Sequence, residues 1–230
     1  MTFKFAILGA AIAASSLLAV AQAWASGNEH VIDDAAVETP GVCHLETWTT
    51  RFARRQGLLN LAPACTRKTW PRLEIGGGLQ RAWSNGAAET TVGPALKLNI
   101  LPEDRGLGLG LAGAAGFGLR AGHLDSASLV APMTIPVGPR LRINLNAGWS
   151  YVRADAKSDA AFVGAQAEWS MARNLTLMVE TFRRDAGHAG GQLGVRWNPG
   201  GGRFDLDLVA GRRIDGASPR AVSLGLTVRR

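Results

Sequence analysis

Apolar and polar residues alternate along most of the chain after Val42. The clearest example is residues 141–152, in which one face is apolar and ends in Trp149 and Tyr151, whereas the other carries arginine, asparagine, glycine and serine. Because side chains of a strand point alternately to its two faces, this period of two predicts β-strands. No helical period competes with it.

Turn residues divide the alternating region into about twelve segments, a spacing typical of all-β proteins. Strands that are apolar on one face and polar on the other are the pattern of membrane barrels, which are apolar outside and polar inside. We therefore expect an all-β protein forming an antiparallel, up-and-down transmembrane β-barrel of about twelve strands. If residues 42–65 formed a periplasmic cap instead, about ten strands would remain. The predicted strands are residues 42–52, 57–65, 71–83, 89–100, 106–120, 126–135, 140–152, 160–170, 174–184, 188–197, 203–213 and 220–229.

Connection lengths and aromatic positions agree with a barrel. Barrels of this kind have short periplasmic turns and longer external loops, and tight connections alternate here with looser ones. The tight connections, expected in the periplasm, are residues 102–105, 136–139, 171–173 and 198–202. Aromatic side chains collect where lipid meets water. The aromatic residues expected at the upper strand ends are Trp83, Trp149, Tyr151 and Phe182, and those at the lower ends are Trp169, Trp197 and Phe204.

The N-terminal region predicts export. Lys4 precedes an apolar run that ends at Val20, and small residues follow, as in a secretory signal peptide. The predicted organisation is a signal peptide at residues 1–25, an exposed periplasmic segment at 26–41 and an outer-membrane barrel of a Gram-negative bacterium at 42–230. The two cysteines, Cys43 and Cys65, would face each other in the first hairpin and form a disulfide in an oxidising compartment.

The polar face carries charges of both signs. Such rows either set selectivity in a water-filled pore or neutralise one another in a narrow, nearly closed barrel, and both interpretations stay open. Arg196 is placed so that it can approach Glu180 on one neighbouring strand and Asp205 or Asp207 on the other. The residues expected to line the lumen are Glu74, Arg142, Asn144, Glu180, Arg196 and Asp205.

The net charge of +7 would suit nucleic acid, but an exported protein rarely meets it and the arginines are dispersed. We expect solvated surface charge, contact with outer-membrane lipid and lipopolysaccharide, and no nucleic-acid partner. Residues 108–113 match a dinucleotide-binding pattern without its strand–helix context, so no cofactor is expected. Glycine there suits a strand whose inner side must be small, to leave room or to accept a close neighbour. No metal site is predicted, because His44 beside Cys43 is too few ligands.

Chemistry of the external loops gives weaker signals. His123 and His188 have serine or aspartate nearby and would be the basis of a lipid-modifying enzyme, but solvated loop histidines are the preferred interpretation and no catalytic residue is expected. The favoured function is a porin-like channel for small solutes, without catalysis. The alternative is a sealed barrel whose loops bind lipopolysaccharide or a partner through the basic residues Arg153, Lys157, Arg183 and Arg184.

Residues 32–35, 40–46, 63–65 and 73–78 resemble proteobacterial outer-membrane barrels assigned to the MetA pathway of phenol degradation. The resemblance covers the cysteine-bearing hairpin and the strand after it. It implies a porin-like barrel that admits small aromatic or other apolar compounds and is inserted by the outer-membrane assembly machinery. Such barrels usually end in an aromatic residue, whereas this sequence ends in Val228-Arg229-Arg230.

Overall fold

The computed structural model describes residues 30–53, 55–153, 158–185, 189–199, 201–212 and 220–230. The predicted signal peptide at residues 1–25 lies outside this part of the chain. Among the described residues, no helix is long and apolar enough to cross a membrane. The one helical element described is a 3₁₀ turn, η1 (Glu103–Arg105).

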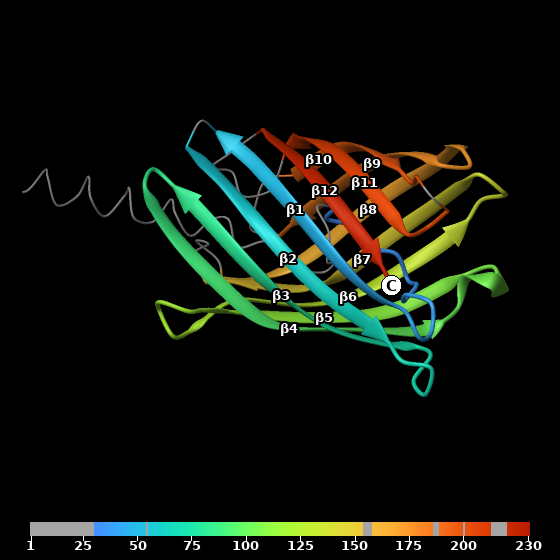
Figure 1. The fold of residues 1–230 in the computed structure, drawn as a ribbon, viewed down its shortest axis with the longest axis horizontal. Coiled ribbons are helices and arrows are strands. Elements are labelled where there is room, and N and C mark those ends of the chain that lie inside the picture. Colours follow the sequence, from blue (N-terminus) through green and yellow to red (C-terminus); the bar gives the residue numbers. More distant parts are fainter. Residues whose placement is uncertain (1–29, 54, 154–157, 186–188, 200, 213–219) are drawn as a thin grey trace, which may run out of the picture.

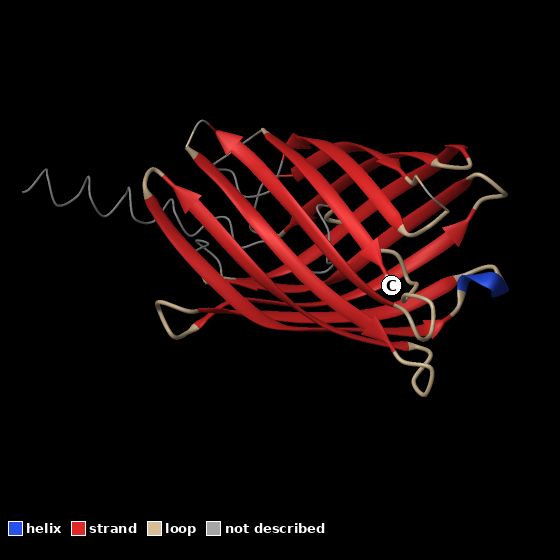
Figure 2. Ribbon diagram, in the orientation of Figure 1, coloured by secondary structure: helices blue, strands red, loops and turns tan. Residues whose placement is uncertain are grey.

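The described residues form twelve antiparallel strands, each paired with its neighbours in sequence (Figures 1 and 2). The last strand pairs with the first, so the sheet closes on itself, as the predicted twelve-stranded barrel requires. The alternative of ten strands is wrong, because residues 43–66 form two strands of the wall. The strands are β1 (Cys43–Ala53), β2 (Gln56–Thr66), β3 (Leu73–Ser84), β4 (Ala87–Leu101), β5 (Gly108–Gly118), β6 (Leu124–Pro136), β7 (Leu141–Val152), β8 (Asp159–Ala172), β9 (Leu175–Arg184), β10 (Ala189–Trp197), β11 (Phe204–Arg212) and β12 (Ala221–Arg229).

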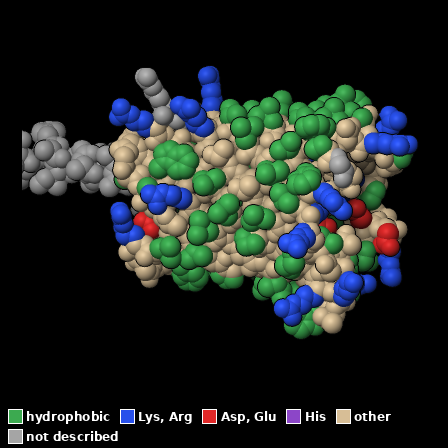
Figure 3. Space-filling view, in the orientation of Figure 1, with side chains coloured by type: hydrophobic (Ala, Val, Ile, Leu, Met, Phe, Trp, Pro, Cys, Tyr) green, Lys and Arg blue, Asp and Glu red, His purple; other side chains and the backbone are tan. Residues whose placement is uncertain are grey.

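The outer surface carries the apolar half of the alternating pattern. Figure 3 shows hydrophobic side chains spread over the middle of the barrel, with Lys and Arg gathered near its two ends. An apolar band between polar rims is the surface that barrels present to lipid. The exposed large side chains of this surface include Leu45, Leu59, Leu79, Leu96, Leu129, Val163, Val179, Leu193, Leu208 and Leu224.

Most of the predicted aromatic positions lie on this outer surface. Trp83, Trp149, Trp169, Trp197 and Phe204 are all exposed. Phe182 is an exception, since only 2% of its surface is exposed, and its placement among the outer aromatic residues was wrong. It shares the even-numbered face of β9 with Glu180 and therefore points into the barrel.

The inner face is polar for most of its length but holds two apolar clusters. One contains Val130, Phe162 and Phe182 together with two residues that precede β1. The other, on the β1–β2–β12 side, contains Trp48, Phe52, Leu58, Ala62 and Ala221. The interior is therefore divided into polar and apolar regions.

The disulfide predicted between Cys43 and Cys65 is present. The two residues are direct partners in the β1–β2 register, at the end of the hairpin opposite its turn. The bond ties the first hairpin together at the barrel rim, where Cys43 also pairs its backbone with that of Arg230. The chain leading into β1, drawn in blue in Figure 1, lies at this end beside the C-terminus.

Candidate functional site

Residues 30–41, which precede β1 and are here called the lumen segment, run from the interior of the barrel to its rim, where residues 39–41 are exposed. The side chains and backbone of His30, Val31, Ile32, Asp33 and Ala35 are each at most 8% exposed. The prediction of an exposed segment at residues 26–41 was therefore wrong for residues 30–38 but not for residues 39–41; residues 26–29 lie outside the described residues. A polar composition was taken to mean contact with water, but here the polar groups contact the inner face.

Glu180 on β9 is the main anchor of the lumen segment. Its Oε2 accepts the backbone N–H groups of Val31 and Ile32 at 2.9 and 3.0 Å. Its Oε1 lies 2.6 Å from Nδ1 of His30 and accepts a hydrogen bond from Gln192 at 2.9 Å. The hydrogen bonds that the buried carboxylate accepts from the protein replace those that it would make to water. Glu180 therefore holds the lumen segment rather than lining an open pore.

Further along, the backbone of the lumen segment continues to bind inner-face side chains. Asp33 N–H donates to Asn146 Oδ1 at 2.9 Å, and Ala35 N–H donates to Thr134 Oγ1 at 2.9 Å. Asn99 Nδ2 donates in turn to the carbonyl of Ala35 at 2.6 Å. Side chains of β4, β6 and β7 thus supply the hydrogen-bond partners that a helix or a sheet would otherwise give to the backbone of the segment.

Glycines on the inner face provide the space. A Cβ placed on Gly164 would lie 2.2 Å from Cδ1 of Ile32, and one on Gly194 would lie 2.7 Å from Cε1 of His30. A Cβ on Gly110 would lie 3.2 Å from the carbonyl oxygen of Ala35. The glycine-rich stretch at residues 108–113 therefore accepts a close neighbour on its inner side, one of the two interpretations drawn from the sequence.

A charged cluster holds the middle of the lumen segment. Lys97 Nζ lies 2.8 Å from Asp33 and 3.1 Å from Asp34, and Arg142 lies 3.2 Å from Asp34. Burial raises the pKa of Asp33 to about 7 despite the attraction of Lys97. For Asp34, burial opposes ionisation, but Lys97 and Arg142 outweigh it and lower the pKa to about 2. Asp34 is thus the firmly ionised member of the pair.

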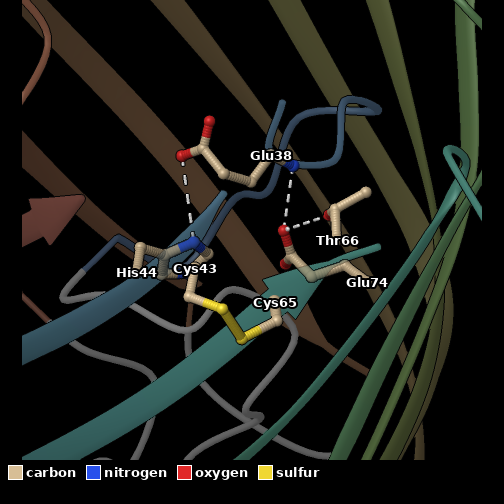
Figure 4. The surroundings of a disulfide bond; sticks show 6 residues. All are labelled: Glu38, Cys43, His44, Cys65, Thr66 and Glu74. Carbon is tan, nitrogen blue, oxygen red and sulfur yellow. Dashed lines mark hydrogen bonds and ion pairs between the residues drawn. A yellow bond between two sulfur atoms is a disulfide. The ribbon is translucent and has the colours of Figure 1, made fainter. Parts of the chain in front are cut away.

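At the rim, Glu38 connects the lumen segment to β12 and to β3. Its carboxylate lies 2.6 Å from Nε of Arg229, and its backbone N–H donates to Glu74 at 2.9 Å. Figure 4 shows Glu38 between His44 and Glu74, close to the disulfide. Arg229 also pairs with Asp205 at 2.7 Å. Burial opposes the charge of Glu38, but the Thr39 N–H and Arg229 outweigh it and lower its pKa.

The six residues expected to line the lumen all lie on the inner face. Glu74, Arg142 and Glu180 contact the lumen segment, which the sequence analysis did not foresee. Asn144 is fully buried and accepts a hydrogen bond from Thr134 at 2.8 Å. Of the pairings expected for Arg196, the one with Asp207 forms, at 2.9 Å.

A cavity of about 290 Å³ remains between the lumen segment and the wall. On one side are residues of the segment from Asp33 to Glu38. On the other, the wall is built from small inner-face residues of neighbouring strands, so that the space is left open rather than filled. The wall residues include His44, Glu46, Trp48, Glu74, Ala95 and Arg229.

The external-loop residues have mixed outcomes. Arg153 and Arg183 are exposed, whereas Lys157 lies outside the described residues. Arg184 was wrongly assigned to the exposed basic residues, because its side chain points from β9 into the barrel, where the guanidinium donates a hydrogen bond to Ser150 at 2.9 Å. His123 lies 2.9 Å from Asp125, and His188 is outside the described residues. Within the described chain, no group of three or more His, Cys, Asp or Glu is arranged to hold a metal.

The closed antiparallel barrel has the fold of the outer-membrane porins. The KdgM porin superposes with a TM-score of 0.63 at 6% identity, covering 80% of this chain and 98% of that one. The NanC porin gives a TM-score of 0.59 at 5% identity, with 81% and 98% covered. The COG4313 outer-membrane channel from Pseudomonas putida F1 gives 0.56 at 10% identity, with 85% and 97% covered. At these identities the likeness is one of fold.

The model of one protein family, described as "Uncharacterised conserved protein UCP029691", matches residues 14–230, and the chain belongs to this family. A comparison with curated protein sequences finds no match. The resemblance to barrels of the phenol-degradation pathway therefore stays a prediction from the sequence.

Proposed function

We propose that the protein is a porin-like channel of the outer membrane of a Gram-negative bacterium, which passes small solutes by diffusion and performs no catalysis. The observation that carries the proposal is a closed barrel whose outer surface is largely apolar and whose inner face is rich in buried polar groups. A closed barrel with this division encloses a polar path across a membrane. The porin fold of the similar structures supports the same function.

The solutes would be small because the lumen segment occupies part of the interior. Passage would follow the cavity of about 290 Å³ beside the segment rather than a wide axial pore. The cluster of Trp48, Phe52 and Leu58 offers an apolar surface next to that path. This surface would suit the aromatic or other apolar compounds that the family resemblance implies.

The test is single-channel conductance of the refolded protein in a planar bilayer, after heat-shifted gel mobility has shown that the barrel is folded. Reproducible steps of current support the channel. A folded protein that produces no steps under any applied voltage would refute it.

The second candidate is a sealed barrel whose loops bind lipopolysaccharide. The network that holds the lumen segment through Glu180, Asn146 and Thr134 favours it, because every contact narrows the interior. Replacing Arg153 and Arg183 by Gln would then abolish binding to lipopolysaccharide micelles. Permeability of liposomes to small solutes would be absent before and after the change.

A further inference from the structure

We propose that the cavity between the lumen segment and β1–β4 is a binding site for a small organic cation, an amine whose ammonium group contacts Glu46 and His44 and whose apolar part lies against Trp48. The proposal rests on the geometry of the cavity and does not require that the barrel conducts.

The charges around the cavity leave an excess of carboxylates. Three cationic side chains line the cavity, and each already has carboxylate partners. Lys97 pairs with Asp33 and Asp34, and Arg196 pairs with Asp207. Arg229 pairs with Glu38 and Asp205. Five carboxylates line the same cavity, namely Asp33, Asp34, Glu38, Glu46 and Glu74. Among the residues that line the cavity, carboxylates therefore outnumber Lys and Arg by two.

Glu46 and Glu74 are the carboxylates without a cationic side chain from Lys or Arg. In the part of the chain that the structure describes, neither forms an ion pair with Lys or Arg. Glu74 is satisfied in part, because it accepts the backbone N–H of Glu38. Among the described residues, the one ion-pair partner of Glu46 within 4 Å is Nε2 of His44, at 3.8 Å, and Arg196, Lys97 and Arg229 act on it from farther away. A largely buried carboxylate without a cation in direct contact is a favourable place for a bound cation.

His44 gives a second, independent indication of a ligand. Its side chain is nine-tenths buried, and within the described chain Nδ1 has no hydrogen-bond partner. Nδ1 lies 3.8 Å from Glu38 (Figure 4), and Nε2 lies 3.8 Å from Glu46. In the neutral ring one nitrogen is a bare acceptor, and the carboxylate that it faces is also an acceptor. A donor placed beside both atoms would satisfy them, and an ammonium supplies three N–H donors.

The walls define the rest of the ligand. Inner-face positions of β2–β5 beside Glu46 are small, and Ala62, Ala64, Gly76, Ala95 and Ala112 all line the cavity. Trp48, two residues along β1 from Glu46, adds an aromatic surface that attracts cations and apolar groups. The volume of about 290 Å³ is near the lower end of the roughly 300–1,000 Å³ found for small-molecule sites. A compound the size of an arylalkylamine fits these limits.

The test is calorimetric titration of the refolded barrel in detergent micelles at pH 8 with phenethylammonium chloride. We expect saturable binding of one molecule per barrel, and no binding of phenethyl alcohol or 3-phenylpropanoate, which have similar shape but no positive charge. Equal binding of the alcohol and the amine would overturn the proposal, as would the absence of any binding by a folded barrel.

Variants locate the site. Glu46→Gln should weaken phenethylammonium binding by about tenfold or more, because it removes a charge-assisted hydrogen bond. Ala95→Leu should abolish binding by filling the cavity from the β4 side. Glu89→Gln is the matched control, since Glu89 is on the inner-face side of β4 opposite Ala82, at the far end from Lys97. Unchanged binding in folded Glu46→Gln, or an equal loss in Glu89→Gln, would refute the assignment.

Discussion

The ring of His30 and the carboxylate of Glu180 lie 2.6 Å apart, although 150 residues separate them in the sequence. This contact fixes one end of the lumen segment near the middle of β9, and the ion pair of Glu38 with Arg229 fixes the other at the rim. Between these points the segment crosses the interior of the barrel. What the lumen can admit therefore depends on residues outside the strands.

Replacing Glu180 by Ala should release the end of the lumen segment. The change leaves two buried backbone N–H groups without acceptors, at a cost of roughly 1–3 kcal/mol for each unsatisfied group. Amide hydrogen exchange of residues 30–35 should accelerate in the folded barrel. Glu180→Gln retains an acceptor oxygen and should show a smaller effect; slow exchange in the Ala variant would contradict the anchoring role.

Gly164→Val should displace the segment by a different route. Even a Cβ at this position would lie 2.2 Å from Ile32 Cδ1 and 3.0 Å from Phe182 Cβ. The same exchange measurement should therefore show faster exchange at residues 31–33. Gly113→Ala is the control, because its Cβ would meet Leu129 Cδ1 at an ordinary 3.6 Å. Similar exchange in both variants would mean that Gly164 does not make room for Ile32.

Removing the disulfide by Cys43→Ser should lower stability without changing the strand count. Closing a loop with this sequence separation of 22 residues is worth about 3 kcal/mol in the chain-entropy model, although the paired hairpin reduces the gain. Urea unfolding followed by gel mobility measures the change. A variant as stable as the disulfide-bonded protein would show that β1–β12 pairing alone holds the hairpin.

The outward aromatic residues should contact lipid. Variants that keep a single tryptophan, either Trp197 on the outer surface or Trp48 inside, can be reconstituted in vesicles with brominated lipid. Fluorescence of Trp197, which is 47% exposed, should be quenched, and that of Trp48, which is 8% exposed, should be preserved. Quenching of Trp48 without quenching of Trp197 would show that the outer and inner faces are assigned the wrong way round.

The alternating pattern was enough to predict the twelve strands and the disulfide, because both follow from local periodicity and from register within one hairpin. The same parity places Phe182 beside Glu180, so its inward position could have been found from the sequence. The lumen segment could not be, because its partners are dispersed over many strands, at sequence separations of up to 191 residues. A signal did exist in the glycines at inner positions 110, 164 and 194, which indicate that another part of the chain comes close.

Conduction beside the lumen segment can be tested by single-channel recording of the barrel with and without that segment. We expect small, reproducible current steps for the full refolded protein and larger steps when residues 30–38 are deleted, with both proteins shown to be folded by gel mobility. Silence of both proteins would contradict the channel, and steps of equal size would contradict the placement of the segment in the conducting path.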